Sequence, residues 1–144
     1  MVRTEKELSD PVAGTRRPLV IAIDDDPAVL SALGLLLGTE PYDLFTTSDP
    51  DTALDLVRSR HVDLVIADYR MPLLSGTGLL QVVKATSPST GRIVLTAYPR
   101  SSWVLRAREM EVMEEVLEKP WDNEELRAAI RRRLWGEEEL PENS

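Results

Sequence analysis

Residues 19–27 read LVIAIDDDP, an unbroken aliphatic run followed by three consecutive aspartates and a proline. An aliphatic run of this length is typical of a strand buried on both faces, and such strands occur mainly in parallel sheets covered by helices. Pro27 suits the first turn of a helix, and Asp26 before it suits the N-cap position. The stretch therefore predicts a strand, a turn that carries carboxylates, and a helix.

The same unit repeats along the chain. From residue 18 onward, apolar runs of strand length alternate with segments of helical periodicity, five times in all before Gly136. The expected strands are 19–23, 42–47, 62–67, 92–96 and a fifth within 112–118. The expected helices begin at Pro27, at Pro50 after Ser48 or Asp49, near Gly76 after a turn containing Pro72, and after Asp122. The fourth helix is expected over about 100–111. This alternation predicts an α/β fold with a parallel sheet wrapped by helices.

The polarity of the strands predicts their order. The first, third and fourth are the most apolar, as expected for inner strands, whereas the second and fifth contain polar residues, as expected at edges. This matches a doubly wound sheet of order 2-1-3-4-5, a flavodoxin-like (βα)5 fold whose ligands bind outside the carboxyl ends of the strands. We expect one such domain over 18–135, an N-terminal tail over 1–17 and an acidic C-terminal tail over 136–144.

Composition excludes several classes of function. The 144 residues include 42% hydrophobic and 29% charged residues, which indicates a globular chain. Zero cysteines exclude thiolate sites, and the single histidine, His61, excludes a multi-histidine metal site within the chain. A net charge of −8 disfavours binding to nucleic acid or to a membrane surface. Residues 1–17 lack the apolar stretch of a signal peptide, so we expect the chain to act in the cytoplasm.

Polar residues stand where the apolar strands end. They are Asp24, Asp25 and Asp26 after the first strand, Asp68 after the third, Thr96 at the end of the fourth and Lys119 after the fifth. Because the carboxyl ends of parallel strands meet at one edge of a sheet, we expect these side chains to lie close together. Carboxylates at such spacing repel each other unless they are protonated, hydrated or neutralised by a cation. Mg²⁺ is the cation we expect, because it prefers a few carboxylates together with waters and phosphate oxygens.

Four segments taken together resemble the bacterial response-regulator receiver domain, a chemotaxis-regulator-like family. They are IAIDDDPAVL at 21–30, DLVIADYRMPLLSGTGLL at 63–80, LTA at 95–97 and EKPWDNEEL at 118–126. The resemblance implies that Asp68 accepts a phosphoryl group, which Thr96 and Lys119 contact. The implied Mg²⁺ ligands are Asp24 acting through water, Asp25, Asp68 and the backbone carbonyl of Arg70.

The resemblance also implies how such a domain works. A sensor histidine kinase or a phosphotransfer protein donates the phosphoryl group, and the domain catalyses only its own phosphorylation and dephosphorylation. Thr96 then moves toward the new phosphoryl oxygens and biases a surface made by the fourth helix, fifth strand and fifth helix. The Lys119–Pro120 bond is expected to be cis. Because nine residues follow Trp135, we expect the output to be a separate protein or a homodimer.

Two features depart from the family pattern, and two other functions stay open. Val116 stands where the family commonly carries an aromatic residue, and the stretch 109–118 is rich in glutamate. A phosphohydrolase of the haloacid-dehalogenase type is one alternative. The three aspartates at 24–26, after the first strand, superficially offer that class's two acidic residues separated by one spacer residue. That class expects a later acidic pair where LTAY stands at 95–98. The other alternative is a docking module that keeps the receiver shape without phosphorylation.

Overall fold

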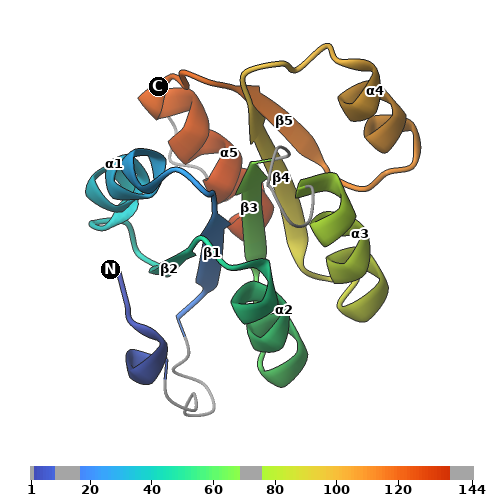
Figure 1. Ribbon diagram of the computed structural model, residues 1–144. Helices are drawn as coiled ribbons and strands as arrows, with labels where there is room; N and C mark the ends of the chain where they lie inside the picture. Colours follow the sequence, from blue (N-terminus) through green and yellow to red (C-terminus); the bar gives the residue numbers. More distant parts are fainter. Residues whose placement is uncertain (1, 9–16, 69–75, 137–144) are drawn as a thin grey trace.

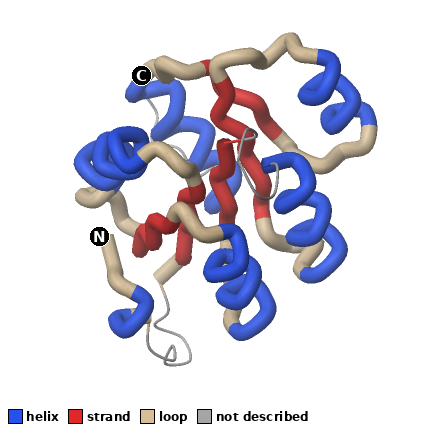
Figure 2. Tube along the Cα trace, viewed as in Figure 1, coloured by secondary structure: helices blue, strands red, loops and turns tan. Residues whose placement is uncertain are grey.

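The protein folds around a five-stranded parallel sheet, shown in Figure 2 as red strands between blue helices. The computed structural model describes residues 2–8, 17–68 and 76–136. The strands are β1 Leu19–Ile23, β2 Asp43–Thr47, β3 Leu64–Asp68, β4 Gly91–Thr96 and β5 Glu115–Glu118. Their order is β2-β1-β3-β4-β5, and every neighbouring pair is parallel. The predicted fold class, strand order and edge strands are therefore confirmed.

The described helices are α1 Pro27–Leu37, α2 Pro50–Ser59, α3 Gly76–Thr86, α4 Ser102–Glu109 and α5 Asn123–Trp135, with a short 3-10 helix η1 at Glu5–Glu7. Three of them, α1, α2 and α5, begin at the capping residues that the sequence indicates. The carboxylates of Asp26, Asp49 and Asp122 accept hydrogen bonds from first-turn amides of α1, α2 and α5. Each cap satisfies a backbone N–H that has no partner within the helix. Among the described helices, none is long and apolar enough to cross a membrane.

Each inner strand has two buried faces. Val20, Ala22 and Ile66 share one cluster with residues of α1 and α5, whereas Ile21, Ile23 and Val65 share the other with residues of α2, α3 and α4. Figure 1 shows the sheet between these groups of helices. Because successive side chains of a strand point to opposite faces, both faces of the sheet are occupied by apolar packing. Polar groups that act on a ligand are therefore confined to the strand ends.

Two predicted elements, the third strand and the fourth helix, differ from the structure by more than one residue at an end. The third strand is 64–68 instead of 62–67, because the Asp63 carboxylate accepts from the Leu19 N–H at 2.8 Å and Asp68 still pairs in register with Leu95. The fourth helix is 102–109 instead of 100–111. It begins later because the Ser101 hydroxyl caps it, and it ends before Glu111, whose φ of 57° is incompatible with a right-handed helix.

Arginines hold the glutamate-rich connection between α4 and β5. Arg92 of β4 is buried, donates from Nε to the Val112 carbonyl at 2.8 Å and pairs with the Glu114 carboxylate at 2.7 Å. Arg132 of α5 donates to both carboxylate oxygens of Glu115 at 2.9 Å. The carboxylates of Glu114 and Glu115, at the start of the edge strand β5, are therefore compensated by cations from the neighbouring strand and helix.

We expect Arg92→Met to lower the free energy of unfolding by about 3 kcal/mol, near the low end for breaking a buried ion pair, because Glu114 still reaches solvent. Urea denaturation monitored by tryptophan fluorescence measures the change. Arg58→Met is the matched control, since Arg58 is exposed and its contact with Asp55 is 3.8 Å long. The control should lose less than about 0.5 kcal/mol. Equal losses in the two variants would show that Arg92 does not anchor the connection.

Candidate functional site

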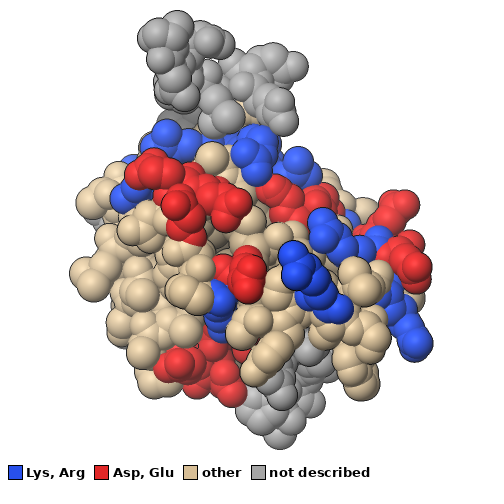
Figure 3. Space-filling view, turned by 90° about the horizontal axis from the view of Figure 1, so that it is seen from above, with Lys and Arg blue, Asp and Glu red and all other residues tan. Residues whose placement is uncertain are grey.

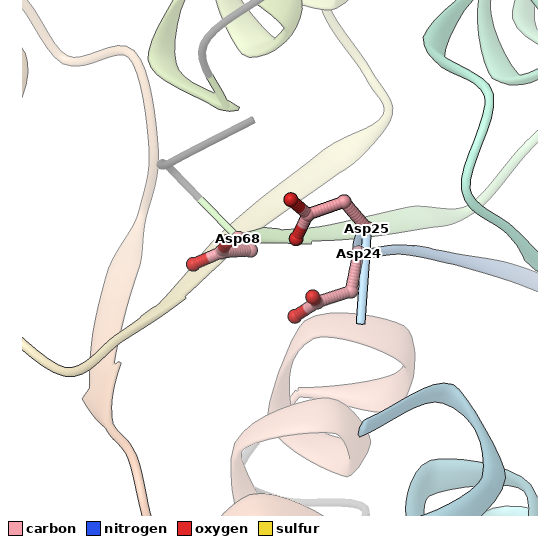
Figure 4. Close-up of side chains that lie close together, drawn as sticks. All are labelled: Asp24, Asp25 and Asp68. Carbon is pink, nitrogen blue, oxygen red and sulfur yellow. The ribbon is translucent and has the colours of Figure 1, made fainter. Parts of the chain in front are cut away.

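Three aspartates meet at the carboxyl ends of β1 and β3. Asp24 and Asp25 follow β1, and Asp68 is the last residue of β3. One carboxylate oxygen from each lies within 4.8 Å of the others. Figure 4 shows Asp24 and Asp25 leaving the end of β1 beside Asp68. Asp24 and Asp68 are only 2% and 8% exposed, whereas Asp25 is exposed, so the cluster opens to solvent on one side.

The backbone after β1 separates the three consecutive aspartates into two roles. The Asp24 N–H donates to the Thr47 carbonyl at 3.3 Å, which continues the pairing of β1 with β2. The Asp24 carboxylate in turn accepts from the Asp26 N–H at 2.9 Å. This turn directs the Asp26 carboxylate to the Ala28 N–H, where it caps α1. Capping thus accounts for the third aspartate only.

Lys119 supplies positive charge to the cluster. Its Nζ lies 2.7 Å from an Asp24 oxygen and 3.3 Å from an Asp68 oxygen. Its backbone N–H donates to the Thr96 carbonyl at 2.8 Å, and the following bond to Pro120 is cis, as predicted. Burial by itself would lower the pKa of Lys119, but the hydrogen bond and charge of Asp24, with those of Asp68, outweigh it and raise that pKa. The ammonium group is therefore charged at neutral pH.

Thr96 closes β4 beside this group and is fully buried. Its hydroxyl accepts from the Tyr98 N–H at 2.9 Å, which leaves the hydroxyl proton free to be donated elsewhere. The Tyr98 carbonyl accepts from the Ser101 N–H at 3.1 Å, and the Ser101 hydroxyl accepts from the Val104 N–H at 3.2 Å. A continuous series of hydrogen bonds therefore connects Thr96 to the first turn of α4.

The donor set of the cluster fits Mg²⁺. Three carboxylates and one ammonium group leave an excess of negative charge in the cluster. The atoms that could coordinate an ion there are carboxylate oxygens, which are hard ligands. The exposed side of Asp25 leaves room for water molecules, which Mg²⁺ usually retains in its coordination shell. Asp24, Asp25 and Asp68 are the described residues that can hold the ion. The expected carbonyl ligand, Arg70, and the turn residue Pro72 lie outside the described residues.

Sequence patterns locate some parts of the site better than others. The expected meeting of Asp24, Asp25, Asp68 and Lys119 occurs in the structure. The role of Ser101 in connecting the site to α4 was missed, because the helix was expected to start at Arg100. A serine just before a helical segment was the available signal. Val116 is half-buried against the core, so an aliphatic side chain fills the position where the family commonly has an aromatic one.

Comparison with known proteins assigns this arrangement to a family. Residues 20–131 match the model of the response regulator receiver domain. The chain is 33% identical over 111 residues to the transcriptional regulatory protein GlrR of Escherichia coli K12, covering 77% of this chain and 25% of GlrR. It is 32% identical over 127 residues to the DNA-binding response regulator MtrA of Mycolicibacterium smegmatis, covering 88% of this chain and 55% of MtrA. The chain thus spans about a quarter and about half of these relatives.

A solved structure gives the same result. The signal receiver domain of an HD domain-containing protein from Pseudomonas fluorescens Pf-5 superposes with a TM-score of 0.76 at 38% sequence identity. The match covers 83% of this chain and 95% of that one. None of the three proteins described is named as a haloacid-dehalogenase-type phosphohydrolase, so these comparisons add no support to that alternative.

We expect Asp25→Asn to weaken Mg²⁺ binding by at least about tenfold. Removal of one unit charge about 4 Å from a dication loses more than about 1.4 kcal/mol, even at an effective dielectric constant near 20. Isothermal titration calorimetry with MgCl₂ measures the affinity. Asp49→Asn is the matched control. Asp49 also follows a strand, β2, but its side chain caps α2, and asparagine caps a helix equally well. Equal affinities of the two variants would place the ion elsewhere.

Proposed function

Because the chain belongs to the response-regulator receiver family, we propose that it is a signalling switch whose state is set by a phosphoryl group on Asp68. The observation that carries this proposal is the placement of Asp68 within 4.8 Å of Asp24 and Asp25, with Lys119 Nζ 3.3 Å from its carboxylate. The family assignment and the acidic cluster fit both phosphorylation and Mg²⁺ binding. We take the receiver domain as 18–135.

The residues of the cluster divide into metal ligands and phosphoryl contacts. Asp25 and Asp68 would hold Mg²⁺ directly and Asp24 through water, with the Arg70 carbonyl as a further expected ligand. When bound, Mg²⁺ supplies positive charge that neutralises carboxylate and phosphoryl oxygens. Lys119 adds a charged ammonium group 3.3 Å from an Asp68 oxygen, and its contact with Asp24 keeps it in place.

In the proposed reaction an oxygen of the Asp68 carboxylate attacks the phosphorus of a phosphohistidine. The new oxygen–phosphorus bond forms as the nitrogen–phosphorus bond breaks, and the imidazole leaves with the electron pair. Lys119 stabilises the carboxylate and the oxygens of the transferred group by its charge. Later attack of water on the same phosphorus regenerates Asp68 and releases inorganic phosphate. The domain thus catalyses only its own phosphorylation and dephosphorylation.

The donor in this proposal is a sensor histidine kinase or a phosphotransfer protein. The helix α1 starts two residues after Asp25 and contains no charged residue. Its surface includes exposed Ala28 and Ala32 and the side chain of Leu35, which is 86% exposed. A neutral, partly apolar helix face next to the phosphoryl acceptor favours packing of a helical donor over electrostatic docking.

The proposed output passes through Thr96 to the surface formed by α4, β5 and α5. When the Thr96 hydroxyl donates to a phosphoryl oxygen, its movement shifts Tyr98 and the Ser101 cap through the hydrogen bonds that join them. On α4, Trp103 is 70% exposed and offers an apolar anchor to a partner. That partner is proposed to be a separate output protein or a second copy of the chain.

We propose that the receiver domain itself contacts neither nucleic acid nor membrane, although the relative MtrA is named as DNA-binding. Three of the four arginines near the end of α5 are engaged in ion pairs, Arg127 and Arg131 with Glu40 and Arg132 with Glu115. Figure 3, seen from above, shows acidic and basic side chains interspersed instead of a continuous basic stripe. We place the phosphoryl exchange in the cytoplasm.

Incubation with acetyl phosphate and Mg²⁺ tests the phosphoryl acceptor. We expect intact-mass spectrometry to record the gain of one base-labile phosphoryl group. Asp68→Asn should abolish the gain, a chelator should abolish it in the unchanged protein, and Asp49→Asn should leave it intact. Sustained hydrolysis of many phosphate esters that does not need Asp68 would support the phosphohydrolase. A folded, Mg²⁺-binding protein that is never modified, even by candidate kinases, would support the docking module.

The role of Thr96 is tested separately from phosphorylation. We expect Thr96→Ala to accept the phosphoryl group to an extent within about threefold of the unchanged protein but to lose the response of α4, because no hydroxyl is left to donate. The nuclear magnetic resonance signal of the Trp103 indole reports on α4. Thr96→Ser keeps the hydroxyl and should keep the shift of this signal on phosphorylation. A full shift in Thr96→Ala would mean that the state is transmitted by another route.

A further inference from the structure

A segment that precedes the receiver domain lies along its sheet. Residues 2–8 are seen in Figure 1 as the dark blue piece near β2. Val2 forms a parallel bridge with Leu44 of β2, and the Arg3 N–H donates to the Leu44 carbonyl at 2.7 Å. The family model begins at residue 20, so this segment is an addition to the family's common fold.

Side-chain contacts hold the segment at both ends. Leu8 is only 6% exposed and belongs to the same buried cluster as Leu19 and Phe45. Arg3 Nε lies 3.3 Å from an Asp43 oxygen at the start of β2. Between them, the Thr4 N–H donates to the Glu7 carboxylate at 2.9 Å and closes the turn of η1. The segment is therefore anchored by a buried leucine, an ion pair and a backbone hydrogen bond.

The surface of α1 leaves room for the first residue of the segment. A methyl group added at Gly38 would lie 3.4 Å from Cγ2 of Val2, and one added at Gly34 would lie 3.7 Å away. These two positions face Val2 from the end of α1 that is farther from the aspartate cluster. Larger side chains there would compete with Val2 for the space beside β2.

The two edges of the sheet are protected in different ways. Exposed edge strands can pair with another chain, and short length and charged side chains reduce this tendency. β5 has four residues, two of them glutamates. β2 has five residues and one charged side chain, Asp43, which Arg3 and Arg17 approach at 3.3 and 3.6 Å. The charge that could discourage pairing at β2 is therefore compensated, and residues 2–8 cover part of this edge instead.

We propose that residues 2–8 are a strap that covers the β2 edge and prevents it from pairing with the β2 edge of a second copy of this chain. Val2 and Arg3 pair with Leu44 on the outer side of β2, so a strand of another copy must displace the strap to pair at this position. The strap competes well because it is part of the same chain, so its local concentration is high. This inference is independent of the phosphorylation of Asp68.

Leu8→Ala in the full chain tests the strap, with Leu35→Ala as the matched control, because the Leu35 side chain is 86% exposed. We expect the Arg3 amide to exchange its hydrogen about tenfold faster or more in Leu8→Ala and at the unchanged rate in Leu35→Ala. Sedimentation velocity over a series of protein concentrations, without phosphoryl donor, should show increased self-association of Leu8→Ala only. Adding Asp68→Asn should change neither result, which separates this proposal from the proposed function.

Arg3→Glu removes the strap without opening a cavity, since it places a negative charge beside Asp43. It should associate as Leu8→Ala does, whereas Arg58→Glu, on an exposed helix surface, should not. Thr46→Lys, which adds a charge to the β2 edge, should reverse the association of either strap variant. The proposal is overturned if exchange at the Arg3 amide does not change in Leu8→Ala. It is also overturned if that exchange is faster yet neither strap variant associates more than the unchanged protein, or if association persists with Thr46→Lys.

Discussion

The contact of Lys119 with Asp24 and Asp68 is the interaction on which the site depends. Carboxylates from two adjacent strands lie within 4.8 Å of one another, a spacing at which like charges repel strongly unless a cation stands between them. Lys119 provides that charge from the end of β5, and its backbone is in turn bound to Thr96 of β4. The ion pairs thus join the carboxyl end of β5 to those of β1 and β3, across the intervening strand β4. They also leave the cluster with excess negative charge, and for this reason a divalent ion and a phosphoryl group suit the same place.

The element that would carry the signal, α4, is attached differently at its two ends. Its first turn is bound through Ser101 and Tyr98 to Thr96, a series of single hydrogen bonds that begins at the end of β4. Beyond its last turn, the buried Arg92 fixes the Val112 carbonyl and the Glu114 carboxylate. Movement of Thr96 would therefore reach the amino end of α4 through these hydrogen bonds, while Arg92 holds the chain beyond its carboxyl end. This arrangement does not need an aromatic residue at Val116, which is consistent with the aliphatic residue found there.

The sequence predicted most of the fold, because both of its signals are local. Uninterrupted aliphatic runs identified β1, β3 and β4 as inner strands, and aspartates before the first turns of α1, α2 and α5 located the helix starts. It predicted less well where a contact between distant residues sets a boundary. β3, for example, extends to Asp68 because of its pairing with Leu95. The start of α4 at Ser102 is set by a local signal, the Ser101 cap, which the prediction missed. The ion pairs of Glu114 with Arg92 and of Glu115 with Arg132 could not be predicted, because each arginine comes from a different helix or strand.

The sequence by itself determined the class of fold, the likeness to receiver domains and which polar residues stand at strand ends, since periodicity, caps and motifs are properties of neighbouring residues. The sequence already indicated Asp26 as the cap of α1. Only the tertiary structure decided that Lys119 Nζ contacts Asp24 at 2.7 Å and Asp68 at 3.3 Å, because these residues lie at the ends of three different strands. It alone revealed residues 2–8 against the β2 edge as well. Their anchors are Leu44, Asp43 and the buried cluster around Leu8, partners that are separated from them in the chain and meet them only when the sheet has formed.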